Sequence, residues 1–81
     1  DSLREKNFSK MRQWVVANVD NDPATVYRKI YDELYNVVDK GSIPQAVLTI
    51  AEYQYKSAFV ADQEINLVAC LVELMAECEF V

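Results

Sequence analysis

The chain has 81 residues, of which 13 are acidic and 8 basic, and it carries a net charge of -5 with no histidine. A chain this short forms one domain with a modest core, so we do not expect a self-sufficient enzyme, and wide apolar helix faces need partners to cover them. Acidic charge repels phosphate backbones and disfavours a surface dedicated to nucleic acid. No apolar run approaches the roughly 18–20 residues that span a bilayer, so a membrane protein is not expected.

The residue types present give little for catalysis. Without histidine, a phosphate-binding loop or a CxxC pair, we expect no catalytic site, no cofactor site and no metal site. Cys70 and Cys78 lie on one predicted helix, where a disulfide would break the helix, so reduced thiols in a cytoplasmic protein are expected. The N-terminal sequence DSLREKNFSK does not resemble a signal peptide.

The apolar spacing is helical throughout, and one glycine and two prolines leave few breaks for strands, so the sequence predicts an all-α fold. Leu3 and its charged neighbours indicate the end of a helical stub before Asn7. Asn7 is placed to cap a helix over roughly 8–18. Phe8, Met11 and Val15 share one side of that helix.

A strong helix start follows at VDNDPATV, where Asp22 is placed as the cap and Pro23 at the first helical position. The predicted helix runs over 23–39. Four apolar side chains are spaced to face a core, and three tyrosines form a ridge beside them that either borders the core or contacts a partner. The core positions are Val26, Ile30, Leu34 and Val37, the tyrosines are Tyr27, Tyr31 and Tyr35, and the polar face is Arg28, Lys29, Asp32, Glu33 and Asn36.

Two more helices complete the predicted bundle. At DKGSIPQ, Gly41 suits a left-handed position after a helix, and Ser42 with Gln45 fits a capping box that begins a helix over 44–58. Asp62 is placed to cap a last helix over 62–79. Its polar residues form one narrow stripe, Asp62, Asn66, Cys70, Glu73 and Glu77. The rest is apolar on more than one flank, so the other helices enclose it or another subunit shares it.

The segment AEYQYK, Ala51 to Lys56, followed by DQEINL, Asp62 to Leu67, and an apolar helix resembles the end of replication factor C small subunits. Clamp-loader small subunits of tailed phages look closer still. The similarity runs from DSLREKN through KMRQW and IYDEL to the ECEF ending, and so covers essentially the whole chain. Gln54 replaces an acid frequent in cellular members, and FVAD lacks a glycine common at that turn. Both departures favour a phage or otherwise divergent member.

The resemblance implies a compact bundle of four to five helices, formed by residues 1–81 as the C-terminal collar domain of a longer AAA+ subunit. In that family the collar domains of five subunits associate, and the AAA+ modules below them bind ATP, the sliding clamp and primer-template DNA. This chain would hold clamp-loader subunits together in DNA replication without an ATP site of its own. DNA and clamp would be contacted only through the missing modules, in the cytoplasm, or the host cytoplasm for a phage.

A second function class uses the same apolar surface: a free-standing acidic helical adaptor that binds a partner's helix. A AAA+ ATPase reading frame directly upstream of Asp1 would favour the collar domain, and a start codon there would favour the adaptor.

The apolar surplus of the last helix and the tyrosine ridge predict where subunit contacts lie. Buried aromatic anchors dominate most interfaces, whereas exposed ion pairs contribute little. We expect Glu77 to lie near a partner's basic side chain. The residues predicted to contribute apolar contacts are Tyr31, Tyr35, Leu74, Met75 and Phe80.

Overall fold

The computed structural model describes residues 7–80, and in that range the chain forms an all-α bundle, as predicted. Its four α-helices are α1 (Phe8–Asn18), α2 (Pro23–Val37), α3 (Ile43–Lys56) and α4 (Gln63–Glu77), and a short 3-10 turn, η1 (Lys40–Ser42), precedes α3. The predicted stub before Asn7 lies outside the described residues.

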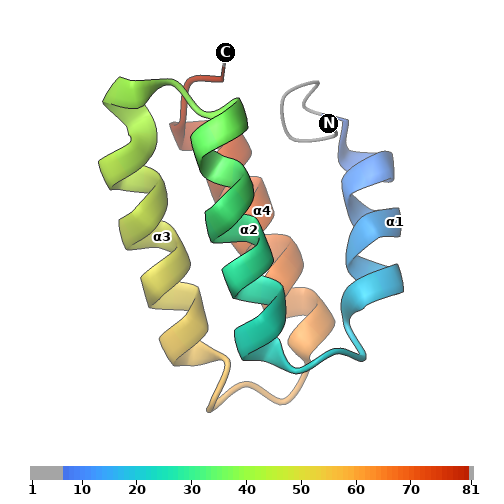
Figure 1. Ribbon diagram of the computed structural model, residues 1–81. Coiled ribbons are helices and arrows are strands. Elements are labelled where there is room, and N and C mark those ends of the chain that lie inside the picture. The colour runs from blue at the N-terminus through green and yellow to red at the C-terminus, as the bar shows by residue number, and fades with distance from the viewer. Residues whose placement is uncertain (1–6, 81) are drawn as a thin grey trace.

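Consecutive helices run in opposite directions, with α3 and α1 at opposite edges of the bundle and α2 and α4 between them (Figure 1). α4 packs against both α3 and α1, and α2 packs against α3. The bundle measures 32 × 24 × 18 Å. One side of α4 therefore faces the core, while the opposite side lies on the outer surface between α1 and α3.

The core lies between the inward sides of the helices. All four apolar positions predicted for α2 are buried. Tyr27 is buried too, whereas Tyr31 and Tyr35 are more exposed. The three tyrosines therefore do not form one ridge. The largest fully enclosed side chains are Met11, Val15, Val26, Leu34, Cys70 and Leu74.

Two of the predicted N-caps are present. The side chain of Asn7 accepts a hydrogen bond from the backbone N–H of Lys10 at 3.1 Å, and Asp62 Oδ1 accepts from Glu64 and Ile65. At the start of α2, Pro23 occupies the first turn as expected, but the side chain of Asp22 makes no capping hydrogen bond. The prediction for that side chain is wrong. The backbone carbonyl of Asp22 accepts instead from the N–H groups of Thr25 and Val26.

The connection between α2 and α3 differs from the prediction. α2 ends at Val37, two residues early, and Gly41 lies inside η1 rather than at a left-handed position, with its N–H donating to Asp39 Oδ2 at 3.0 Å. Ser42 forms no capping box: its hydroxyl accepts from the N–H of Glu79 at 2.9 Å, and Gln45 instead contacts Thr49 and Glu77. α3 runs over Ile43–Lys56 rather than 44–58.

The C-terminal segment explains this difference. α4 ends at Glu77, not at residue 79, and the chain after it is extended and forms an antiparallel bridge between Val38 and Phe80. The N–H of Asp39 donates to the carbonyl of Glu79 at 2.9 Å. Figure 1 shows the segment that follows α4 beside the link that joins α2 to α3. The backbone at 38–39 and 79–80, which we expected to continue α2 and α4, pairs across the two segments instead.

Candidate interaction surfaces

The six side chains predicted to make subunit contacts lie in two parts of the bundle. Tyr31 and Tyr35 are on α2, and the other four are on α4 or just after it. Leu74 is 0% exposed, because it lies with Leu67 and Leu71 on the side of α4 that faces the core. The Leu74 side chain therefore has no exposed surface that a partner could contact. For the other five residues, contact with a second subunit stays a prediction.

Tyr31 and Tyr35 contact each other on the outside of α2. Their rings meet edge to face with centroids 5.5 Å apart, and their hydroxyl oxygens lie 3.1 Å apart. The hydrogen bond with Tyr31 raises the pKa of the Tyr35 hydroxyl. The Arg28 guanidinium lies 5.1 Å from the centre of the Tyr31 ring and pairs with Asp32 at 3.2 Å. The two tyrosine rings thus form an aromatic pair that lies beside charged side chains on the surface of α2. The Tyr35 side chain is 59% exposed.

The C-terminal members of the predicted set make contacts within the chain. Met75 and Phe80 are partly buried and pack against the core. Glu77 is exposed, and its Oε2 accepts a hydrogen bond from Gln45 Nε2 at 3.1 Å. The carboxylate that we expected beside a partner's basic side chain already has a polar contact on α3.

The outward side of α4 carries the apolar surplus, but at other residues than those predicted. Ile65 and Val72 lie seven residues apart, opposite the buried Leu67, Leu71 and Leu74. Ile65 is 67% exposed. Ile65 and Val72 are seven residues apart in the sequence, but so are the inward Leu67 and Leu74. The spacing alone therefore does not indicate which side of α4 faces a partner.

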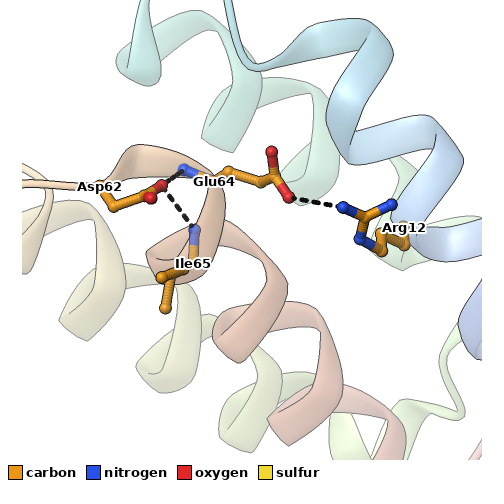
Figure 2. A network of polar contacts seen from close by, with 4 residues as sticks. All are labelled: Arg12, Asp62, Glu64 and Ile65. Carbon is orange, nitrogen blue, oxygen red and sulfur yellow. Dashed lines mark hydrogen bonds and ion pairs between the residues drawn. The ribbon is translucent and has the colours of Figure 1, made fainter.

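An ion pair joins the first turn of α4 to α1. The guanidinium of Arg12 lies 3.4 Å from Glu64 Oε2, while Asp62 caps the helix start next to it (Figure 2). Phe8 and Val16 lie four residues before and after Arg12 and therefore share its side of α1. Four large apolar side chains on α1 and α4 are 40–67% exposed. We name them the α1–α4 face: Phe8, Val16, Ile65 and Val72.

A second apolar surface lies on the outer side of α3. Leu48 and Tyr55 are seven residues apart on one side of the helix, and the Phe59 ring, just after it, is 5.2 Å from the Tyr55 ring. These side chains are 66%, 71% and 72% exposed. We name them the α3 ridge. Beside them, Glu52 Oε1 pairs with Lys56 Nζ at 3.5 Å. The sequence prediction missed this surface, although its i, i+7, i+11 spacing was the available signal.

The interior polar groups have structural partners. Asn66 Nδ2 donates to Tyr27 Oη at 2.9 Å and to the Tyr53 carbonyl at 3.1 Å. Both cysteines are free and buried, as expected for reduced thiols. Burial raises the pKa of Cys70 to about 12 and also raises that of Cys78, so neither thiol is set up as a nucleophile.

Searches for relatives find no matching protein family and no matching curated protein. Within residues 7–80, no helix has the length and apolar character needed to cross a membrane. In the same range, no group of three or more cysteine or carboxylate side chains is placed to hold a metal ion.

Proposed function

We propose that this chain is a subunit-association domain, the C-terminal collar domain of a replication factor C type clamp-loader small subunit. One observation supports an association role above all others. Among residues 7–80, eight large apolar side chains remain exposed around a core that is already closed. The resemblance of AEYQYK and DQEINL to clamp-loader subunits supports the specific identity.

The exposed side chains are not needed to complete the fold. The buried core is continuous across all four helices, and no buried side-chain nitrogen or oxygen within residues 7–80 lacks a hydrogen-bond partner. Covering a large apolar side chain is worth about 1.5–3 kcal/mol relative to leaving it in water. Grouping of such side chains on two surfaces is typical of interaction sites rather than of scattered surface residues.

In this proposal the domain keeps several subunits in one assembly. ATP binding and hydrolysis belong to AAA+ modules outside these residues, and the domain takes no part in the chemistry. Permanent contacts between collar domains would keep the modules adjacent, so that ATP-driven motion of one module changes the position of its neighbours. DNA and the sliding clamp would be bound by those modules.

The test begins with the natural protein that contains this sequence. We expect a C-terminally tagged form, isolated from its source, to carry AAA+ modules and to load a sliding clamp onto primed DNA in the presence of ATP. Removing residues 7–80 should abolish assembly, measured by sedimentation, while the remaining modules still bind ATP. Normal assembly and loading without the domain would refute the proposal. Isolation of an 81-residue protein bound to an unrelated helical partner would support the adaptor instead.

A further inference from the structure

α1 is attached to the bundle by less buried surface than the other helices. It packs mainly on α4, at one edge of the bundle (Figure 1). Two of its side chains, Met11 and Val15, are buried, whereas α2 and α4 bury five each. With 11 residues, α1 is also the shortest of the four described helices. An isolated helix of that length is marginal in water, so α1 depends on its packing against α4.

Polar contacts tie α2, α3 and α4 to one another. Asn66 of α4 donates to the Tyr27 hydroxyl of α2 at 2.9 Å and to the Tyr53 carbonyl of α3 at 3.1 Å. The segment after α4 also pairs with the link between α2 and α3, where the N–H of Asp39 donates to the Glu79 carbonyl at 2.9 Å. Neither tie includes a residue of α1, so both remain in place when α1 moves away.

An ion pair between α1 and α4 lies at the surface. Arg12 and Glu64 are 3.4 Å apart, and their side chains are 57% and 35% exposed. Exposed ion pairs of this kind contribute little to stability, because water and salt screen the two charges. The docking of α1 therefore depends mainly on the burial of Met11 and Val15, and on Trp14, which packs against the core.

The link between α1 and α2 has the properties of a hinge. The N–H groups of Val19 and Asn21 donate to carbonyls of α1, so these hydrogen bonds are local. A crevice of about 10 Å³, room for one water molecule, lies under the link. It is lined by Val19 and Asn21, by the start of α2, and by Gln63 and Leu67 of α4. The link is thus not closely packed on α4, and its movement breaks few contacts.

We propose that α1 is a detachable arm. It leaves α4 and unfolds locally about a hinge at residues 19–22, while α2, α3 and α4 stay assembled. Local openings need less free energy than unfolding of the whole chain, and they occur in segments with few buried apolar contacts. Opening uncovers the apolar surface that Met11 and Val15 cover in the closed form. It is a property of the bundle itself and does not depend on the identity of the longer protein.

Opening also changes one of the two exposed apolar surfaces. In the α1–α4 face, Phe8 and Val16 are on α1, whereas Ile65 and Val72 are on α4. The complete face therefore exists only while α1 is docked. A ligand of this face would bind the closed form alone and would hold α1 in place. The α3 ridge stays complete in both forms, because it contains no residue of α1.

Amide hydrogen exchange on the 81-residue chain tests the arm directly, because each exchange rate reports the opening that exposes that N–H group. We expect the slowest amides of α1 to exchange at least about tenfold faster than the slowest amides of α2 and α4. Equal rates in the three helices would show that α1 opens only with the whole bundle, and would overturn the inference.

Two conservative variants distinguish local from global opening. Ile50→Val shortens a buried side chain on α3, so it destabilises the closed form and the open-arm form alike relative to the unfolded chain. It should speed exchange of the slowest α2 and α4 amides by roughly two- to tenfold and leave exchange in α1 unchanged. Val15→Ala destabilises the closed form alone and should speed exchange in all four helices by one common factor. An Ile50→Val variant in which α1 speeds up as much as α2 and α4 would contradict the arm.

Trypsin gives a second measurement, because cleavage requires an opened segment of chain. Arg12 on α1 and Arg28 on α2 are both exposed and both paired with a carboxylate, so they differ mainly in the helix that must open. We expect cleavage after Arg12 to precede cleavage after Arg28, and Val15→Ala to accelerate it. Earlier cleavage after Arg28 would show that α2 opens more readily than α1, against the inference.

Discussion

Asn66 on α4 donates a hydrogen bond to the hydroxyl of Tyr27 on α2 at 2.9 Å, inside the core. The same amide group reaches the Tyr53 carbonyl near the end of α3. One buried side chain therefore links three helices. Buried polar groups of this kind favour one packing arrangement over its alternatives, because any shift along the helix leaves them without partners.

We first predict that Asn66→Leu lowers the free energy of unfolding by about 1–3 kcal/mol, because the Tyr27 hydroxyl loses its hydrogen-bond partner in the core, while the Tyr53 carbonyl still accepts from the Ser57 N–H. Urea denaturation followed by circular dichroism measures the change. Adding Tyr27→Phe to Asn66→Leu should cost less than the sum of the single changes, since the unsatisfied hydroxyl is then removed. Strict additivity of the two effects would contradict the link.

The second prediction concerns alkaline pH. Burial raises the pKa of Tyr27 from 10.0 to about 12 and that of Cys70 from 9.0 to about 12. Below the unfolded-state pKa values, both groups are protonated in both states and their contribution to stability is complete. As pH rises towards 12, the unfolded chain loses these protons first, so stability falls. We expect the free energy of unfolding to decrease above about pH 9.

Urea titrations between pH 8 and pH 11.5 measure this decrease. Tyr27→Phe should flatten the part of the profile above pH 10, and Cys70→Ala the part that begins near pH 9. The exposed Tyr55→Phe is the control and should leave the shape of the curve unchanged. A profile that rises with pH in this range would contradict the assigned direction.

Third, both thiols should resist modification while the protein is folded. Near pH 8, a thiol with a pKa of about 12 holds on the order of a thousandfold less thiolate than one at the ordinary value of 9.0. Cys70 is also fully enclosed, and Cys78 is buried. Labelling with a chromogenic disulfide reagent should be slow in buffer and fast in urea. Equal rates in the two conditions would show that the cysteines are accessible in the folded chain.

A fourth prediction tests the C-terminal bridge. Ser42→Ala removes the acceptor of the Glu79 N–H and should cost about 0.5–1.5 kcal/mol in unfolding free energy. Amide hydrogen exchange at Glu79 and Asp39 should speed up more than exchange in α1. Ser57→Ala, which removes a local hydroxyl contact to the Gln54 carbonyl, is the matched control and should leave the exchange of Glu79 unchanged.

The fifth prediction separates the tyrosine pair from the two proposed surfaces. Tyr35→Ala removes an exposed ring and its edge-to-face contact with Tyr31, so we expect only a small loss of stability. If the pair is also a subunit contact, assembly measured by sedimentation should weaken at concentrations where the monomer remains folded. Unchanged assembly would restrict the contact region to the α3 ridge and the α1–α4 face.

Local signals in the sequence were enough for the helices and for two of their caps. Asn7 and Asp62 bond to backbone N–H groups two or three residues away, so a few neighbouring residues determine these contacts. The four helices begin within about one residue of their predicted starts for the same reason. The inward positions of α2 were also predictable, because charged residues occupy its other side and leave one apolar stripe.

The tertiary structure decided the features that depend on distant residues. Ser42 does not cap α3 because its hydroxyl accepts from Glu79, 37 positions along the chain. On α4, Leu74 and Ile65 are similar in apolar character, so composition alone does not tell which one is enclosed. Packing against α3 and α1 puts Leu74 in the core and leaves Ile65 exposed, because one side of a helix between two neighbours necessarily faces out.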